Sequence, residues 1–554
     1  MLLVASAVPA SAHAQLESTS PAPSSVLLVP PTQVVLHFGE PVEVDFGSLR
    51  VLGPNGQRVD SGGAHHPGGD GHAVATSLSA DLPKGTYVVA WRVISADSHP
   101  VHGAFVFSVG SASGASKADA EATTLADQSG SAVVGAIYWL IRFAAFVGLL
   151  FLVGLALMVT LAWRQGGSTR RVGRLLWASW WLLLTATVLG IGIQGVYAAA
   201  LPIGDIVRPS LITSVLHARF GIVEVLRLLL LIAFVPVLLA VQDRLDNGSR
   251  RWKWIVPVEL VLGAALLFTP GLAGHASSGD QPGIGLALDV VHLAAASLWL
   301  GGLLLLASFL VARAPDDQKP EDPARVTLKV STVAFIAVVV IVGTGVCQSI
   351  RQVGSIYALF HTTYGWTLVV KILFVILLIG LGALSRRIVH GGWGLRHPVR
   401  PPVTPEHSGQ LSKLRRSVLA EIAIALVVLA VTALLVNAVP AKQAAALPFS
   451  TSFSTLGVQV NTIIDPARAG GGNTVHVYVL SGTGTPKAIP ELDMTLSLPA
   501  ENLGPLAIPL VVAGPGHYNA NNVVIPVTGN WILRFTVRTD AIDEQVVSVP
   551  LPIH

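Results

Sequence analysis

The chain has 554 residues, of which 52% are hydrophobic and only 12% are charged, and its formal net charge is +4. This composition predicts a membrane protein with several spans and additional soluble parts, and it excludes an ordinary soluble enzyme; the sequence also contains no nucleic-acid-binding motif. The single cysteine, Cys347, excludes a disulfide framework, and a total of three methionines excludes a methionine-rich metal site. The 17 histidines are therefore the main possible metal ligands.

The first 110 residues predict a secreted β-domain. Residues 1–12 are apolar and end in Ala-Ser-Ala, which is typical of the tail of a signal peptide; cleavage there would make His13 the first residue of the mature chain. Residues 13–110 contain short segments rich in Val, Thr, Phe and Tyr, separated by Gly, Pro and Asn at intervals of roughly ten residues. This pattern indicates a small all-β sandwich. Residues 111–131 are polar and small, as in a linker.

Eight apolar segments follow, each long enough to cross a bilayer core, which needs about 20 residues. They are residues 132–163, 175–200, 213–241, 254–274, 284–311, 326–350, 363–385 and 416–437. The loops after the first, third, fifth and seventh segments carry clusters of arginine and lysine, whereas the other three loops carry only Arg208 and Arg351. Basic loops stay in the cytoplasm. The sequence therefore predicts an eight-helix transmembrane domain over residues 132–437 in a cell membrane, with both termini outside.

The last part of the chain returns to a strand pattern. Residues 438–447 are interpreted as a linker, and residues 448–554 as a second extracytoplasmic all-β sandwich. The chain is therefore expected to be a multidomain protein, with an all-β sandwich on each side of a helical membrane bundle. His476 and His517 in the second sandwich could bind copper or a partner, although single histidines in such a fold are usually surface residues.

A first candidate metal site lies in the N-terminal sandwich. The α-amine and Nδ1 of His13 can chelate one ion, and a distant histidine and carboxylate would complete an N,N,N,O square, a geometry diagnostic of Cu(II). Asp97 and His99 follow a predicted strand, and their i, i+2 spacing places both on one face of an extended segment. The alternative is an exposed loop of ordinary turn residues, which the spacing by itself favours.

The residues of this block also carry a family resemblance. HAQLESTSPAP at its start, FGEPVE, and LPKGTYVVAWRVISADSHPVHGAFVFSVG at its end resemble the periplasmic copper-binding protein CopC. The resemblance implies that His13, Asp97 and His99 bind Cu(II). The methionine-rich Cu(I) loop of that family has no counterpart in this sequence.

The membrane part resembles the copper-resistance protein CopD. The stretches that carry this resemblance are SVLHARFGIVEVLRLLL, GLAGHASSG, LDVVHLAAASLWLGGLLL, STVAFIAVVVIVGTG and TTYGWTLVVKILFVILLIGLGALSRR. The C-terminal block, with GPGHYNANNVVIPVTGNWILRFTVR, is similar to the YtkA-like domain. The whole chain thus resembles a CopC–CopD fusion with a YtkA-like tail.

A second candidate site lies around the fifth apolar segment. His275 is in the polar turn before it, and His292 is about 12 Å into it at roughly 1.5 Å per residue. Asp289 and Trp299 lie at helical spacing from His292, so all three should face the same way. Ionisable residues inside a membrane are expensive, so His275 and His292 are predicted transmembrane copper ligands. The alternative is a structural hydrogen bond from the Asp289 carboxylate to an imidazole.

Further ligands are available near the outer ends of the segments. Besides Asp289, these are His217 at the start of the third segment, His361 in the loop before the seventh, and Cys347 near the outer end of the sixth. A Cys347 thiolate would suit Cu(I), but a buried small apolar residue is the favoured interpretation.

The leading hypothesis is copper acquisition without catalysis. The outer domain captures Cu(II), with an extracytoplasmic copper chaperone as a conceivable donor, and the bundle passes Cu(I) or Cu(II) inward. Two alternatives remain open: a haem-bearing electron-transfer protein or metalloreductase, since transmembrane histidines can be axial haem ligands, and a protein that sequesters or senses copper at the surface without transport. The chain contains no nucleotide-binding P-loop and no DKTG phosphorylation motif, so ATP is not the expected energy source.

Overall fold

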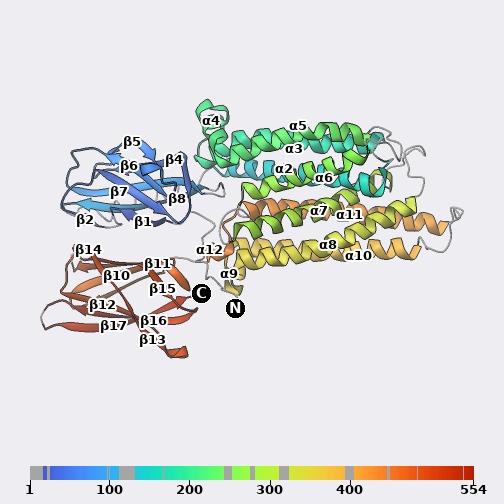
Figure 1. Cartoon of the computed structure of the whole chain (residues 1–554). Helices are drawn as coiled ribbons and strands as arrows, with labels where there is room; N and C mark the ends of the chain where they lie inside the picture. The colour runs from blue at the N-terminus through green and yellow to red at the C-terminus, as the bar shows by residue number, and fades with distance from the viewer. Residues whose placement is uncertain are drawn as a thin grey trace, which may run out of the picture. The chain divides into compact units, whose positions relative to one another are not determined.

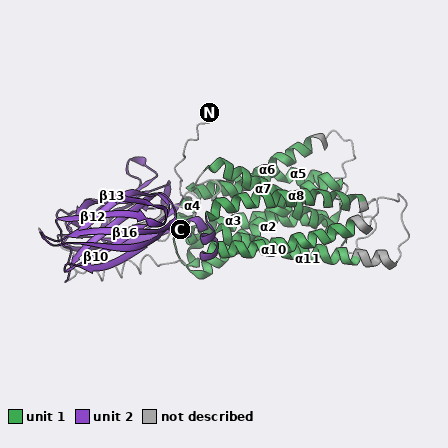
Figure 2. Cartoon of the chain, turned by 90° about the horizontal axis from the view of Figure 1, so that it is seen from below, with its two compact units in different colours: residues 1–9, 130–354, 363–439 green, residues 10–129, 355–362, 440–554 purple. Residues whose placement is uncertain are grey.

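The computed structural model describes most of the chain. The described residues are 16–21, 25–95, 98, 100–110, 131–164, 166, 169–242, 252–274, 281–310, 323–392, 405–445, 449–482, 485–540 and 542–553. The chain divides into two compact units (Figure 2). One unit contains the long helices, and the other contains the two β-rich parts together with residues 355–362.

The N-terminal part is a sandwich of two four-stranded sheets, as its pattern predicted. The strands are β1 (Leu16–Ser20), β2 (Val26–Leu27), β3 (Gln33–Phe38), β4 (Val42–Leu52), β5 (Asp60–His65), β6 (Ala73–Leu78), β7 (Gly85–Ser95) and β8 (Pro100–Val109). They form sheets of order β1-β3-β6-β5 and β2-β8-β7-β4. Alternate residues point inward, and Leu36, Tyr87 and Phe107 are fully buried between the sheets.

The middle of the chain is helical. The helices are α2 (Ala132–Ala162), α3 (Arg170–Ala198), α4 (Pro209–His217), α5 (Arg219–Gln242), α6 (Trp252–Leu272), α7 (Pro282–Leu310), α8 (Pro323–Val353), α9 (Ile356–His361), α10 (Thr363–Gly392), α11 (Pro405–Val436) and α12 (Ala441–Ala444). Eight of these, counted over the described residues, are long and apolar enough to cross a membrane. Those eight run side by side (Figure 1) and match the eight predicted segments.

Helix α2 is at the centre of this bundle and packs against both α3 and α7. Most of its C-terminal half is buried, from Val147 to Ala162. The crossing of α2 with α7 is made by small residues: a Cβ on Gly154 would overlap the carbonyl of Ser297, and a Cβ on Gly301 would overlap the backbone of Gly154. Glycine lets two helix backbones approach this closely. This contact fixes the position of α7, which carries Asp289 and His292.

Two helices differ from the predicted segments. The third segment was expected to begin near residue 213, but Ala218 has extended backbone (φ −67°, ψ 154°) and separates α4 from α5. Glycine at 221 allows this break, because a side chain there would overlap the carbonyl of Val215. In addition, the predicted linker 438–447 contains the short helix α12.

The C-terminal part is a second sandwich. Its strands are β9 (Phe449–Thr455), β10 (Val458–Asp465), β11 (Gly470–Ser481), β12 (Glu491–Leu498), β13 (Leu503–Ile508), β14 (Val511–Gly514), β15 (His517–Ile525), β16 (Gly529–Arg538) and β17 (Glu544–Ile553). A five-stranded sheet of order β14-β15-β11-β10-β9 faces a four-stranded sheet of order β13-β12-β16-β17. Trp531 and Phe535 are fully buried in the shared core.

Candidate functional site

The most polar stretch of α7 faces α8 and α10. His292 of α7 bonds to Thr344 of α8, and Asp289, one turn earlier, lies 3.5 Å from the side-chain amide of Gln348. Lys371 of α10 is close enough to interact electrostatically with both Asp289 and His292. We call these five side chains the α7–α8–α10 cluster. Its members come from three of the spans.

Thr344 determines which nitrogen of His292 is available. Nδ1 of His292 lies 2.8 Å from the Thr344 hydroxyl, and that hydroxyl lies 2.7 Å from the carbonyl oxygen of Val340, one turn earlier in α8. The hydroxyl donates its single proton to this carbonyl, so it accepts a hydrogen bond from Nδ1–H of His292. The neutral ring then has its lone pair on Nε2, the form of histidine that binds a metal ion.

The ring of His292 lies against a helix surface without a side chain. A Cβ on Gly345 would be 3.7 Å from Cε1 of His292. The neighbouring Gly345 and Thr344 thus provide the space and the hydrogen bond for one imidazole. The expected bond between Asp289 and an imidazole is not formed within the described part of the chain, because each of the two side chains pairs with α8 instead.

Below this cluster is a cavity of about 200 Å³. It lies between α7, α8, α10 and α11, and Trp299 of α7 lines it, seven residues after His292. Its walls are mostly apolar, but Ser385, Arg386 and Glu421 also line it. Glu421 accepts hydrogen bonds from Ser385 and Ser417. A buried carboxylate is therefore available on the same side of the bundle as His292.

A separate ion pair lies on α5. Arg227 donates two hydrogen bonds from Nη1 to Glu224, at 2.6 and 2.7 Å, and a third from Nε to Thr269 of α6 at 2.8 Å. Glu224 and Arg227 are buried and, with Arg142, line a cavity of about 60 Å³. The i, i+3 spacing of the two residues places both side chains on one face of α5. Because both charges are paired, this group is a structural link between α5 and α6.

The accessory ligands suggested by the sequence do not join the α7–α8–α10 cluster. His217 ends α4, is exposed, and bonds through Nδ1 to the carbonyl of Thr213. His361 ends α9, bonds in the same way to Tyr357 and stacks on its ring at 4.0 Å. Cys347 is exposed on α8, so the interpretation as a buried small residue is wrong. Its place on the helix directs it away from the packed side of α8.

Four predicted ligands lie outside the described residues: His13, Asp97, His99 and His275. Among the residues that the structure does describe, no group of three or more His, Cys, Asp and Glu side chains is placed to hold a metal ion. The sequence analysis missed Thr344 and Gln348, which are uncharged and lie more than fifty residues after His292. No spacing signal links them to α7, since only the packing of α8 on α7 brings them together.

Family models match three parts of the chain. A model described as CopC domain matches residues 16–110. One described as copper resistance protein D-like, N-terminal domain, matches residues 131–286, and one described as copper resistance protein D matches residues 324–435. The eight apolar helices and the two membrane-family matches make the chain a multi-pass membrane protein.

Known relatives agree with these matches. The chain is 29% identical over 540 residues to the copper transport protein CutJ of Bacillus subtilis (strain 168), an alignment that covers 94% of this chain and 92% of that protein. It is 32% identical over 114 residues to copper resistance protein C of Escherichia coli, covering 20% of this chain and 90% of that protein. The crystal structure of CopC from Methylosinus trichosporium OB3b matches at 32% identity, covering 18% of this chain and 93% of that chain, with a TM-score of 0.17. The chain therefore belongs to the copper transport and resistance family in which a CopC domain and a CopD membrane domain share one polypeptide.

Proposed function

We propose that this protein captures Cu(II) outside the membrane and passes copper through the bundle into the cell. Capture uses His13, Asp97 and His99, and transfer uses His275 and His292. The single observation that carries the membrane step is the arrangement of His292. Its ring is held by Thr344 through Nδ1, which directs the lone pair to Nε2, and Asp289 lies one helical turn earlier on α7.

The capture step is supported by the match of residues 16–110 to the CopC domain. In the sequence, Asp97 and His99 fall between β7, which ends at Ser95, and β8, which begins at Pro100. These two strands pair in an antiparallel arrangement, so the predicted ligands belong to the segment that connects them in the sequence. A free amine, two imidazoles and a carboxylate are donors suited to Cu(II). An extracytoplasmic copper chaperone is the partner that we expect to deliver the ion.

The membrane step needs compensation for the positive charge of the ion. Asp289 supplies a negative charge one turn from His292, and the bilayer makes an uncompensated cation very expensive. Lys371 interacts with Asp289 when no cation is present. An arriving copper ion competes with Lys371 for the same carboxylate, so the cluster can exchange one positive charge for another.

The route beyond His292 is suggested by the cavity under the cluster. Trp299 is two helical turns after His292, a distance of about 10 Å along α7, and it lines this cavity together with Glu421. Glu421 is the next buried carboxylate that an ion would reach on the way to the basic loops. With those loops in the cytoplasm, the proposed direction is from the CopC domain toward the cell interior.

The test is copper uptake into liposomes that contain the purified protein, with and without an imposed potential or a reductant. Wild-type protein should accumulate copper, and the His292→Ala variant should lose uptake while its outer domain still binds Cu(II). His217→Ala is the matched control, because His217 is an exposed histidine of the same bundle whose hydrogen bond, within the described residues, is to the carbonyl of Thr213 on its own helix. This control should transport like the wild type.

Three results would contradict the proposal. Equal copper accumulation with and without the protein would favour sequestration at the surface. Equal uptake by wild type and His292→Ala would show that His292 is not part of the transport path, although the protein still transports copper. A sharp Soret band in the purified protein would instead support the haem-bearing alternative.

A further inference from the structure

Two histidines meet on one face of the C-terminal sandwich. His476 and Tyr478 lie on β11, and His517 lies on β15, where it pairs directly with Tyr478 across the sheet. The intervening residue Val477 points into the core, so all three rings are on the other face of the five-stranded sheet. The expectation of separate surface histidines is wrong here, because His517 is only 2% exposed.

The three rings lie close together, and their orientations are restricted by stacking. Nδ1 of His476 lies 3.1 Å from Nε2 of His517. The Tyr478 ring stacks on His517 with centroids 4.6 Å apart and planes 17° apart, and the His476 and His517 centroids are 5.4 Å apart. The two nitrogens thus point toward one another, and Tyr478 limits how far the His517 ring can turn.

The contact between the two histidines leaves one buried nitrogen without a hydrogen bond. The bond between the rings uses one proton, and Nδ1 of His517 is buried without any hydrogen-bond partner. A single hydrogen bond does not offset the cost of leaving a second buried nitrogen unsatisfied. Such exceptions among buried polar groups call for another explanation, which includes a bound ion.

Both rings are also in the right state to bind a metal. Burial lowers the pKa of His476 to about 4, and burial together with the nearby His476 lowers the pKa of His517 to about 4. Each ring is consequently neutral at pH 7, with one nitrogen lone pair available. Metal ions bind the neutral imidazole.

We propose that His476 and His517 form a second extracytoplasmic copper site, which binds the ion through Nδ1 of His476 and Nε2 of His517. The ion takes the place of the shared proton. The ring that held this proton carries it on its other nitrogen, so both rings stay neutral. The proposal concerns binding alone and is independent of transport by the membrane bundle.

The separation of the two nitrogens fits such a site. Two ligands at about 2.0 Å from one ion lie about 2.8 Å apart at a right angle and about 3.3 Å apart at a tetrahedral angle. The observed 3.1 Å falls between these values, so the rings need little movement to bind.

Copper is favoured over zinc by the number of ligands. Structural zinc sites use four protein ligands, and in the described part of the chain no third His, Cys, Asp or Glu joins the pair. Copper is also bound most strongly by nitrogen ligands in the series of divalent metals.

The first test measures the copper content of the full-length protein after dialysis against Cu(II), or against Cu(I) with a reductant. Wild type should bind one copper ion more per chain than His476→Gln or His517→Gln. Asn519→Ala is the matched control, since Asn519 lies opposite His476 on the same face and carries no imidazole. Its copper content should equal that of the wild type. Equal copper content in all four proteins would overturn the proposal.

The second test uses only the wild type, so it holds even where a variant does not fold. Diethylpyrocarbonate acylates accessible histidines, and tryptic cleavage at Arg468 and Lys487 isolates His476 in one peptide. Copper should reduce acylation of His476 severalfold. If copper leaves the acylation of His476 unchanged, the pair is not a copper site. The same conclusion follows if zinc protects His476 but neither Cu(I) nor Cu(II) does. If copper protects His476 but the protein does not transport copper into liposomes, the transport function proposed for the bundle is wrong and the copper site proposed here still stands.

Discussion

At the scale of single residues, the chemistry of His292 depends on Thr344. The histidine itself is visible in the sequence as a rare ionisable residue inside an apolar segment. The threonine is not, because threonine in a membrane helix usually bonds its own backbone and carries no signal. Here the same hydroxyl bonds the carbonyl of Val340 and also accepts from His292. The threonine thereby selects the tautomer of the His292 imidazole.

This dependence predicts the effect of Thr344→Val. The substitution keeps the shape of the side chain but removes the acceptor for Nδ1–H, so the ring of His292 is no longer oriented. Loss of such a supporting hydrogen bond typically reduces metal affinity by about 10- to 100-fold. Copper uptake by liposomes should accordingly need about tenfold or more copper for half-maximal rate.

Thr332→Val is the control for this prediction. Thr332 lies on the same helix, is exposed, and its hydroxyl donates to the carbonyl of Leu328. Its replacement should leave the copper dependence unchanged. If both variants behave alike, the bond between Thr344 and His292 has no role in binding copper.

At the scale of helices and strands, small residues decide where α7 lies. Gly154 of α2 and Gly301 of α7 face each other, and a Cβ on either would overlap the backbone of the other helix. The two helices therefore cross at a fixed point, two to three turns beyond His292. A glycine in an apolar segment does not by itself identify its partner helix, so this crossing could not be predicted from the sequence.

Gly154→Ala should lower the stability of the bundle. Overpacking typically costs about 1–3 kcal/mol, and here the overlap is with backbone, which cannot change rotamer. Thermal unfolding of the purified protein in detergent should move to lower temperature. A transition temperature equal to or above that of the wild type would contradict the described crossing.

Gly343→Ala provides the matched comparison. Gly343 lies within α8, and a methyl group added at its Cα would meet no atom within 4 Å. Alanine is the better helix former by about 1 kcal/mol, so this variant should be as stable as the wild type or slightly more stable.

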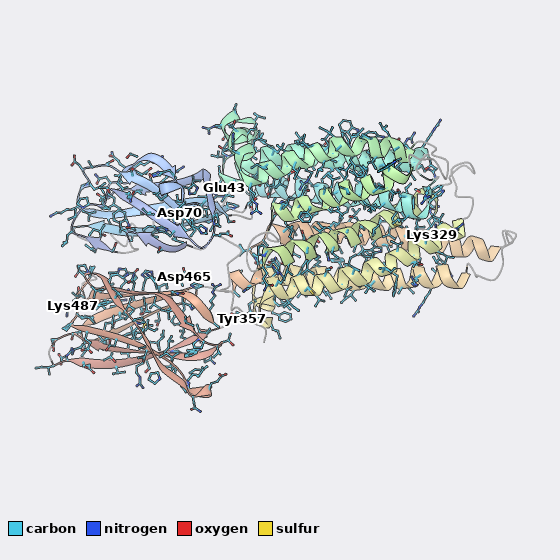
Figure 3. All side chains as sticks on the ribbon, in the orientation of Figure 1. Glu43, Asp70, Lys329, Tyr357, Asp465 and Lys487 are labelled. Atoms are coloured by element: carbon cyan, nitrogen blue, oxygen red, sulfur yellow. The ribbon has the colours of Figure 1, made fainter. Side chains whose placement is uncertain are left out.

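At the scale of the whole molecule, the basic residues gather at one end of the bundle. Lys329, labelled in Figure 3, lies near the start of α8. Arg170 begins α3, and Arg208 follows the other end of α3. Both arginines are exposed. From the rule that basic loops remain in the cytoplasm, we predict that Arg170 lies inside and Arg208 outside.

Cysteine labelling can test this orientation in intact cells. In a Cys347→Ser background, Arg208→Cys should react with a membrane-impermeant maleimide, whereas Arg170→Cys should react only after the membrane is permeabilised. The unsubstituted background protein should remain unlabelled and serves as the control. Labelling of Arg170→Cys in sealed cells would reverse the orientation and, with it, the direction of the proposed transport.

The sequence by itself determined the layout of this protein. The alternation of apolar and polar residues predicted two β-sandwiches, and the length of the apolar segments predicted eight spans, because both patterns depend only on neighbours along the chain. The motifs of residues 13–110 and of the membrane segments indicated the family. The pairing of Glu224 with Arg227 was also predictable, since one helical turn connects them.

The tertiary structure decided which residues meet. Three contacts join residues that lie on different helices or strands and are more than forty positions apart. They are the hydrogen bond of His292 with Thr344, the helix crossing at Gly154, and the contact of His476 with His517. The packing of whole elements brings them together, and no local periodicity records it. The break between α4 and α5 was not predicted for the same reason. It depends on the close contact of Gly221 with the backbone of Val215, which the sequence does not reveal. Local pattern thus specified the elements, and close packing between them specified the sites.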